Sequence, residues 1–162
     1  NVMMGYYQMP EETAEVIDSE GWFHSGDLGY IDDNGYAYIT GRKKNVIITK
    51  NGKNVYPEEL EYLLSNIPFV QESFVFGQEG GPDRDVTIVA SIKIDEEAMK
   101  EILGSEYSEA DEKRIIWEEV DKLNEKAPFF RKIKKVIVRK KDFYKNTSNK
   151  LIRYSEENKR EE

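Results

Sequence analysis

Residues 41–61 read Gly-Arg-Lys-Lys-Asn-Val-Ile-Ile-Thr-Lys-Asn-Gly-Lys-Asn-Val-Tyr-Pro-Glu-Glu-Leu-Glu, and this stretch decides the fold of the chain. The apolar run around Ile47 is too short for a helix, and the Lys-Asn-Gly-Lys sequence that follows it is a turn signal. Pro57 suits the first turn of a helix, and the glutamates after it complement the positive end of the helix dipole. The stretch therefore predicts a strand, a tight turn, a second strand and a helix.

Two details of this stretch concern access and burial. Gly52 lacks a Cβ and tolerates positive φ, so it can form a turn tip that another molecule approaches closely. Apolar residues follow Pro57 at helical spacings, and we expect them to form one buried face. They are Leu60, Leu63, Leu64 and Ile67.

The composition bounds the class of protein. The chain has 162 residues, no cysteine and a formal net charge of −8. This length suits one domain, or one domain with a piece of another. The absence of cysteine excludes a disulfide framework and a thiolate metal site, and the acidic balance argues against general nucleic-acid binding. No apolar run approaches the roughly 18 residues of a membrane-spanning helix. We therefore expect a cytoplasmic protein that binds no nucleic acid and has no membrane span.

Positive charge gathers near the C-terminus of this acidic chain. Such a run is usually a solvated face, and attraction of a polyphosphate ligand is the alternative. The residues are Arg131, Lys132, Lys134, Lys135, Arg139, Lys140, Lys141 and Lys145.

Upstream of the opening stretch, the sequence predicts a helix and a β-hairpin. Acidic residues after Pro10 favour a short helix over residues 10–17. Strands are expected over residues 22–30 and 35–40, joined by the turn signal Asp-Asp-Asn-Gly at residues 32–35.

Two polar residues in this part invite a functional interpretation. Asp27 follows Gly26, which keeps its carboxylate accessible, and the residue type alone leaves two roles open: binding a ligand or capping a turn. His24 is the only histidine, and the sequence has no cysteine or second histidine to form a zinc cluster or a nucleophilic pair with it. We expect His24 to be structural or exposed to solvent.

Downstream of the opening stretch, runs rich in β-branched and aromatic residues predict three more strands. They cover residues 69–76, 86–94 and 135–139. Asp95 and Ser108 are N-cap candidates for two helices between the second and the third of these strands. This order of elements predicts an α+β fold, a small lid with a mixed sheet and helices on one face.

Two segments of this part are expected to lack regular structure. Residues 77–84 contain consecutive glycines but lack the Lys-Ser/Thr of a Walker motif, so we interpret them as a hairpin loop. Residues 155–162 form a highly charged tail, which we expect to be frayed.

Three motifs resemble those of the adenylate-forming enzymes, the superfamily of acyl-CoA synthetases, luciferases and peptide-synthetase adenylation domains. Residues 41–61 resemble the hinge motif of that family, and Ser-Gly-Asp at residues 25–27 resembles its short Ser/Thr-Gly-Asp motif. Residues 145–153, Lys-Asn-Thr-Ser-Asn-Lys-Leu-Ile-Arg, resemble the motif that delivers the catalytic lysine. The three motifs stand in the family's order.

The resemblance implies a role for five residues. Lys150 matches the catalytic lysine, which contacts the acyl carboxylate and the phosphate oxygens. Asp27 matches the aspartate that accepts hydrogen bonds from the ribose of ATP, and Arg42 matches the arginine that reaches ribose and phosphate. Lys44 matches the hinge residue, and Gly52 would lie beside the pantetheine arm of CoA. No residue is implied as a metal ligand.

The sequence departs from the family pattern around the lysine. Asn149 stands where a glycine usually precedes the lysine, and Lys145-Asn146 replace Pro-Lys. Asparagine tolerates the left-handed backbone conformation better than most residues, so the loop can keep its shape.

The resemblance also implies an organisation and a reaction. Residues 1–41 would end a large, incomplete N-terminal adenylation domain, residues 42–44 would be the hinge, and residues 45–154 the C-terminal lid. The co-substrates, ATP with Mg²⁺ and CoA, would be held mainly by the missing N-terminal domain, the partner of the lid. The full-length protein would then be an AMP-forming acid–CoA ligase, and the hinge motif looks most like that of long-chain fatty acyl-CoA ligases. The fragment alone would be inactive.

Two alternatives stay open at this point. An adenylation domain would load an amino or aryl acid onto a carrier protein, although no carrier-domain serine motif follows Arg153. A non-catalytic α+β module would bind a partner through its sheet or its basic strand. The second alternative accounts for the fold but not for three motifs in order.

Overall fold

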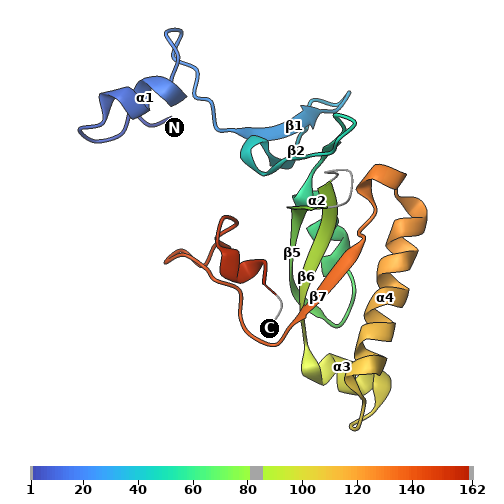
Figure 1. The fold of residues 1–162 in the computed structure, drawn as a ribbon. Coiled ribbons are helices and arrows are strands. Elements are labelled where there is room, and N and C mark those ends of the chain that lie inside the picture. Colours follow the sequence, from blue (N-terminus) through green and yellow to red (C-terminus); the bar gives the residue numbers. More distant parts are fainter. Residues whose placement is uncertain (1, 81–85, 161–162) are drawn as a thin grey trace. The chain divides into compact units, whose positions relative to one another are not determined.

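The computed structural model describes residues 2–80 and 86–160, and the chain folds into two compact units, Asn1–Lys44 and Asn45–Glu162 (Figure 1). The first unit is built from a short helix and an antiparallel hairpin, and a 3-10 turn crosses the boundary between the units. These elements are α1 (Pro10–Val16), β1 (Asp27–Ile31), β2 (Ala37–Arg42) and η1 (Lys43–Asn45).

The β1–β2 hairpin is closed by the turn that the sequence predicts. Asp32 Oδ1 accepts hydrogen bonds from the backbone N–H groups of Tyr36 (2.9 Å) and Asn34 (3.0 Å). These hydrogen bonds lower the pKa of Asp32 below its ordinary value, and the bond from Tyr36 has the largest effect. Tyr30 and Tyr38 stack on neighbouring strands with their ring centroids 5.1 Å apart.

The first strand is shorter than predicted. It begins at Asp27 rather than at residue 22. Asp18 Oδ1 accepts a hydrogen bond from the backbone N–H of Trp22 (2.9 Å), and Gly26 adopts a φ of +75°. Both features bend the backbone away from the extended conformation, so the segment before Asp27 is a loop.

The second unit is an α+β domain built around a sheet. Its elements are β3 (Ile47–Ile48), β4 (Asn54–Val55), α2 (Pro57–Ser65), β5 (Val70–Glu79), β6 (Val86–Ile94), α3 (Glu96–Leu103), α4 (Glu109–Lys126), η2 (Phe129–Arg131), β7 (Lys135–Arg139) and η3 (Glu156–Asn158). The strands β5, β6 and β7 form a mixed sheet in this order, with β5 antiparallel and β7 parallel to β6. Parallel strands need a long crossover connection, which α3 and α4 supply.

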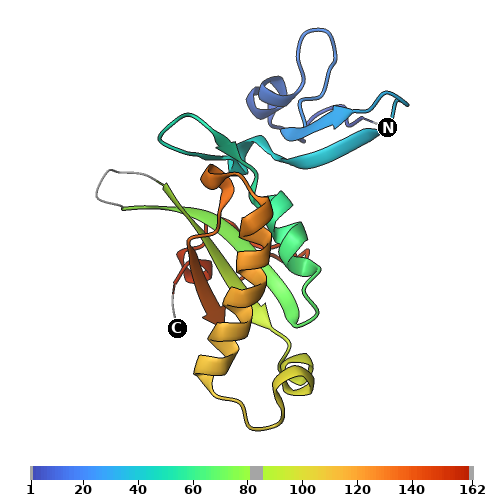
Figure 2. The same ribbon diagram turned by 90° about the vertical axis from the view of Figure 1, so that its right-hand side faces the viewer.

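The main hydrophobic core lies between one face of this sheet and the helices α2 and α4, which lie on the same side of it (Figures 1 and 2). Val75 of β5 and Ile92 of β6 point into it, and Leu64 and Val120 from the two helices are fully buried. The prediction of helices on one face is confirmed. Leu63 is 39% exposed, so its predicted burial is wrong: it stands at the rim of the buried face of α2.

The opposite face of the sheet carries a second, smaller apolar cluster. The chain that follows β7 crosses this face, on the side away from α4 (Figures 1 and 2), and covers it without a helical layer. The cluster consists of Phe74, Phe76, Val89, Ile137 and Phe143, with Leu151 packed against it.

The predicted helix starts are confirmed. The Asp95 side chain accepts hydrogen bonds from two backbone N–H groups at the start of α3, and Ser108 forms a capping box with Asp111 at the start of α4. The hairpin loop predicted for residues 77–84 begins later, because β5 continues to Glu79; residues 81–85 lie outside the described residues. Within the described part of the chain, no helix is long and apolar enough to cross a bilayer.

The charged tail contains a short 3-10 helix. Residues 156–158 form η3, and the Asn158 side chain is fully buried. The expected fraying is therefore wrong for this segment. High charge favours fraying, but the Asn158 side chain satisfies buried backbone groups and holds the segment in place.

Candidate functional site

Asp27 and Arg42 form an ion pair at the open end of the β1–β2 hairpin. The antiparallel register sets them opposite each other, and Arg42 Nε lies 2.9 Å from Asp27 Oδ1. Their side chains are 29% and 62% exposed, so both charges face solvent. The adjacent turn uses Ser25 Oγ, which accepts the backbone N–H of Asp27 (3.2 Å). A carboxylate acceptor and a guanidinium donor thus stand side by side, the groups suited to a hydroxyl and a phosphate.

Lys44 is exposed and lies in η1, where the two compact units meet along the chain. The residue before it is tied to the first unit, since the Lys43 N–H donates to the carbonyl of Gly26 (2.9 Å). The residue after it is tied to the second unit, since Asn45 Nδ2 donates to Glu58 Oε1 (2.5 Å). The backbone of Lys44 therefore links two separately anchored residues.

Gly52 forms the exposed tip of the turn between β3 and β4. Its N–H donates to the carbonyl of Thr49 (2.8 Å), and the Thr49 N–H donates to the carbonyl of Lys53 (3.0 Å). Gly52 has a φ of +69°, and a Cβ built on it would meet no heavy atom within 4 Å. The predicted open turn tip is what the structure has at this position.

Lys150 stands at the end of a tight hairpin that follows β7. The Asn146 N–H donates to the carbonyl of Lys150 (2.8 Å), and Lys145 pairs with Leu151 below it. Asn149 adopts a φ of +59°, the left-handed conformation that a glycine takes without cost. The departure from glycine is therefore tolerated as expected. The Lys150 side chain is exposed to solvent.

Asn146 shapes the hairpin tip from within, a role that our sequence reasoning missed. Its Oδ1 accepts hydrogen bonds from the backbone N–H groups of Ser148 (3.0 Å) and Lys150 (2.9 Å). Asparagine hydrogen-bonding to the backbone two residues on is a known turn signal, so Asn146-Thr-Ser could have predicted this contact. The hairpin borders an open groove of about 340 Å³, which reaches Tyr62 of α2.

The base of the hairpin is fixed by two charged contacts to the lid. Lys145 pairs with Glu72 of β5. Arg153 forms a two-point pair with Glu61 of α2, in which Nη1 lies 2.9 Å from Oε1 and Nη2 binds Oε2. Glu61 Oε1 also accepts the backbone N–H of Val75 (2.8 Å), which ties the pair to the sheet. Lys145 and Glu72 lie 73 residues apart in the sequence, and Arg153 and Glu61 lie 92 residues apart, so no local pattern predicts these two pairs.

The basic run near the C-terminus is divided among separate contacts. Arg131 pairs with Glu59, and Lys145 pairs with Glu72. Lys140 Nζ lies 2.8 Å from Glu109 Oε1, and this hydrogen bond raises the pKa of Lys140. At least three of the eight basic side chains thus pair with carboxylates of the second unit, so the run is not a uniformly solvated face.

His24 pairs with a carboxylate at the surface of the first unit. His24 Nε2 lies 2.9 Å from Asp18 Oδ2, with 63% of its side chain exposed, as expected for a structural residue. The pKa of Asp18 is below its ordinary value. The main cause is the hydrogen bond from the Trp22 backbone N–H, and the contact with His24 adds to it. Among the described residues, no group of three or more acidic or histidine side chains is arranged to hold a metal ion.

The predicted site residues thus lie in four places. Asp27 and Arg42 are in contact in the first unit. Gly52 and Lys150 occupy the tips of two different hairpins of the second unit, and Lys44 lies where the units join.

Relatives of this chain are CoA ligases of several kinds. A long-chain-fatty-acid–CoA ligase of Rattus norvegicus is 44% identical over 79 residues, 48% of this chain and 11% of the relative. A 4-coumarate–CoA ligase of Oryza sativa subsp. japonica is 40% identical over 74% of this chain and 20% of the relative. A long-chain-fatty-acid–CoA ligase of Gallus gallus is 33% identical over 88% of this chain and 22% of the relative. The chain thus spans between 11% and 22% of the length of these curated relatives.

Solved structures with the same fold are adenylate-forming enzymes. ATP-bound MatB from Rhodopseudomonas palustris is 34% identical over 93% of this chain and 27% of that protein, with a TM-score of 0.69. The o-succinylbenzoate CoA synthetase of Bacillus subtilis, in complex with its acyl-adenylate intermediate, is 27% identical over 94% of this chain and 28% of that protein, with a TM-score of 0.72. The family model described as AMP-binding enzyme C-terminal domain matches residues 44–159. This match covers well over half of the chain, which therefore belongs to the family of AMP-binding enzyme C-terminal domains.

Proposed function

We propose that this chain is the C-terminal part of an AMP-forming acyl-CoA ligase and that Lys150 is its catalytic lysine. The observation that carries the proposal is the braced hairpin that presents Lys150 to solvent, in a domain of the AMP-binding family. An ammonium at an exposed, fixed tip can reach into a nucleotide site formed by another domain. That domain, the end of which is proposed for residues 1–41, would hold most of the ATP and CoA.

The proposed reaction has two halves. A carboxylate oxygen of the acid attacks the α-phosphorus of ATP, the bond to the bridging oxygen breaks, and pyrophosphate leaves. The CoA thiolate then attacks the acyl carbon, and AMP leaves. Negative charge develops on oxygen in both halves, so positioning and electrostatic stabilisation are the tasks of the protein.

The residues divide these tasks. Lys150 would stabilise the phosphate and acyl oxygens in the first half. Asp27 would accept hydrogen bonds from the ribose. Arg42, whose Nε lies 2.9 Å from Asp27 Oδ1, would donate to the ribose and the phosphate. Rotation about Lys44 would then replace the Lys150 hairpin by the Gly52 turn, beside which the pantetheine arm would pass.

Mg²⁺ would accompany ATP and neutralise phosphate charge. The described acidic residues form no cluster for it, and Asp27 is paired with Arg42, so its ligands are proposed to lie outside this chain. A reducing cytosol is the proposed compartment, since it suits a chain without cysteine.

A long-chain fatty acid is the proposed substrate, in line with the fatty-acid ligases among the relatives. The full-length protein should release pyrophosphate from ATP with palmitate and should form palmitoyl-CoA. Other relatives are named for 4-coumarate and 2-succinylbenzoate. A preference of this protein for one of these acids would leave the proposed reaction valid but would show that the substrate is not a long-chain fatty acid. Transfer to a carrier protein but not to CoA would support the peptide-synthetase alternative, and no reaction with any acid would support a non-catalytic module.

The role of Lys150 is tested by the two half-reactions of the same full-length protein. Lys150→Ala should slow pyrophosphate release by about a hundredfold to a thousandfold, the range for loss of one oxyanion donor. Thioester formation from supplied palmitoyl-adenylate should persist. The matched control is Lys141→Ala, another exposed lysine between β7 and the hairpin, which should leave both rates unchanged. Equal losses in both half-reactions of Lys150→Ala would contradict the proposed role.

A further inference from the structure

Asn158 joins the two sides of the hairpin that carries Lys150. Its Oδ1 accepts the backbone N–H of Tyr144 (2.6 Å), and its Nδ2 donates to the carbonyls of Tyr144 (3.1 Å) and Ile152 (3.0 Å). Tyr144 and Ile152 are themselves paired, since the Ile152 N–H donates to the Tyr144 carbonyl (3.0 Å). One side chain therefore contacts both strands of the hairpin at its base.

The site of Asn158 is closed to water, so these hydrogen bonds have no substitute. The residue is 0% exposed, and its amide uses both Nδ2 hydrogens and an Oδ1 lone pair. An alanine would leave buried backbone groups without partners, and an aspartate would set a carboxylate against two carbonyl oxygens. Asparagine is the residue that fits this pattern of one acceptor and two donors.

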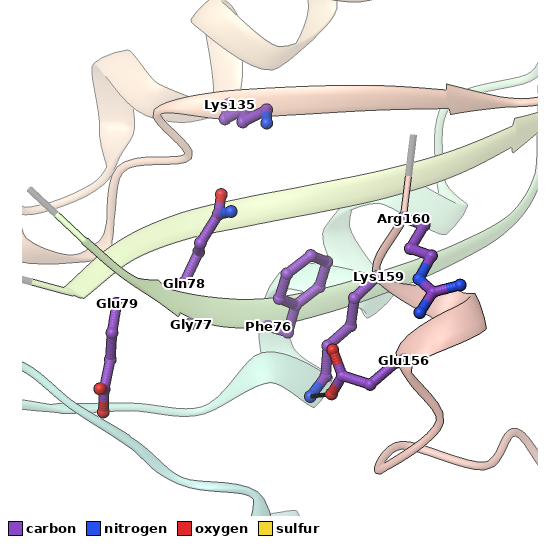
Figure 3. Close-up of a pocket in the computed structure, with 8 residues that line it drawn as sticks. All are labelled: Phe76, Gly77, Gln78, Glu79, Lys135, Glu156, Lys159 and Arg160. Carbon is purple, nitrogen blue, oxygen red and sulfur yellow. Dashed lines mark hydrogen bonds and ion pairs between the residues drawn. The ribbon is translucent and has the colours of Figure 1, made fainter. Parts of the chain in front are cut away.

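Asn158 is itself anchored to the sheet through η3. The carbonyl of Glu157 accepts a hydrogen bond from Arg139 Nη1 (2.8 Å), and the Arg139 guanidinium lies 5.0 Å from the centre of the Phe143 ring. Figure 3 shows the end of η3 beside Phe76 of β5, at a groove of about 540 Å³ in which Lys159 Nζ bonds to Glu156 (2.9 Å). The contact to the hairpin thus originates from a fixed element.

The hairpin depends on these contacts more than the rest of the lid does. The main core contains residues of α2, α3, α4, the sheet and the β3–β4 hairpin, and it includes neither Asn158 nor the hairpin that carries Lys150. The hairpin touches the second apolar cluster through Phe143 and Leu151. Loss of the Asn158 contacts would therefore loosen the hairpin and leave the main core in place.

We infer that Asn158 is a positioning residue for adenylation, which holds the hairpin so that Lys150 reaches the reacting phosphate. The inference rests on the proposed function of Lys150. Asn158 acts through the backbone of Tyr144 and Ile152 and does not contact the lysine side chain. A displacement of about 1 Å at a reacting group can cost about a hundredfold in rate, so a loosened hairpin has a large effect without any change in the lysine itself.

The test uses Asn158→Ala and the isosteric Asn158→Asp in the full-length protein, with palmitate, ATP and Mg²⁺ as probes. Both variants should lower kcat of pyrophosphate release by about tenfold to a hundredfold, while the KM values for ATP and palmitate stay unchanged. Thioester formation from supplied palmitoyl-adenylate should stay at the wild-type rate. Because both half-reactions need a folded lid, their ratio within one variant corrects for any loss of folded protein.

A matched control and a second readout separate positioning from folding. Glu157→Gln, a substitution within η3, removes the exposed side-chain contact to Arg160 and should behave as wild type. Hydrogen exchange at the backbone amides of Asn146, Lys150 and Ile152 should accelerate in both Asn158 variants, with no change in β6.

Three results would overturn the inference: equal losses in both half-reactions, a raised KM at unchanged kcat, or full activity of Asn158→Asp. Lys150→Ala is measured in parallel. If this variant does not slow adenylation, the proposed role of Lys150 is contradicted, and not the role of Asn158 in holding the hairpin. Hydrogen exchange would still decide in that case whether Asn158 holds the hairpin.

Discussion

Gly52 offers a test of the CoA path at a single residue. Its φ of +69° would strain a side chain other than asparagine or aspartate by about 1–2 kcal/mol, although the space around it is open. We predict that Gly52→Leu slows thioester formation, because the side chain projects into the proposed path of the pantetheine arm. Adenylation should persist. The measurement is the pair of half-reaction rates in the full-length protein.

Gly35→Leu is the control that separates obstruction from strain. Gly35 has a φ of +85° and equally open space, so leucine there should cost a similar free energy of unfolding. It lies in the β1–β2 turn, and both half-reactions should be unchanged. If Gly35→Leu also lost only thioester formation, the effect of Gly52→Leu would no longer support a CoA path beside Gly52.

At the scale of single residues, the sequence predicted backbone conformation better than long-range contact. The left-handed conformation of Asn149 and the positive φ of Gly52 follow from residue type and were expected. The pairing of Arg153 with Glu61 and the burial of Asn158 join residues whose neighbours in the sequence give no hint of them. Charge alone suggests a frayed tail, whereas burial depends on which backbone groups need partners.

Helix α4 contains a carboxyl group whose ionisation opposes folding. Glu112 is 6% exposed, and burial raises the pKa of its carboxyl. The folded state then binds more protons than the unfolded state, so this group adds stability as the pH falls through the raised pKa toward 4.5, its ordinary value. We predict that Glu112→Gln raises the free energy of unfolding at neutral pH and that the gain disappears below pH 4.5. Urea unfolding across this range measures it.

Glu118→Gln on the same helix is the matched control. Glu118 is half exposed and pairs with Arg114 at 2.7 Å, so its removal should change the free energy of unfolding by less than about 0.5 kcal/mol at any pH. A lower stability of Glu112→Gln at neutral pH would mean that the ionised carboxylate stabilises the fold, contrary to the prediction.

At the scale of elements, boundaries with a chemical marker were predicted best. Asp95 and Ser108 cap their helices where the sequence indicated, because a side-chain acceptor at a helix start is a local feature. The end of β5 was placed too early, since its last residues are held by pairing with β6 and carry little local signal. The sequence also did not predict that the chain after β7 covers the opposite face of the sheet, because this segment has no regular periodicity.

The relation between the two units is tested at Lys44. A proline would fix φ near −65° and remove a backbone donor, so only one of the two proposed poses would stay accessible. We predict that Lys44→Pro in the full-length protein folds normally, keeps one half-reaction and loses most of the other. Lys44→Ala, which leaves the backbone free, should keep both. Near wild-type rates for both halves in Lys44→Pro would move the pivot elsewhere, and the proposed boundary at residues 42–44 with it.

The 162-residue chain is predicted to be inactive by itself. The proposed nucleotide contacts from Asp27, Arg42 and Lys150 act on a substrate held mainly by another domain, so palmitate, ATP, Mg²⁺ and CoA should give no turnover. Pyrophosphate release is the measurement, with the full-length protein as the positive control. Robust release by the purified chain would contradict the two-domain account.

For the molecule as a whole, the α+β lid was predictable because three ordered motifs and a clear alternation of patterns agreed. How its hairpins would meet a substrate was not, because that depends on contacts that no local pattern carries. Lys150 and Gly52 were recognised from motifs, and each lies in a hairpin closed by local pairing, Lys145 with Leu151 and Ile48 with Asn54.

The parallel pairing of β6 with β7 has a consequence for the growing chain on the ribosome. Val89 cannot meet Lys135 until the helices between them have been made, and the hairpin and Asn158 emerge later still. At about 5–20 residues per second, Lys150 follows Arg42 by roughly 5–20 s. Under the proposed function, a partly made enzyme holds its ribose-binding pair for that time without the lysine needed for adenylation. We therefore expect it to form acyl-adenylate about a hundredfold to a thousandfold more slowly, as for Lys150→Ala, until the C-terminal domain is complete.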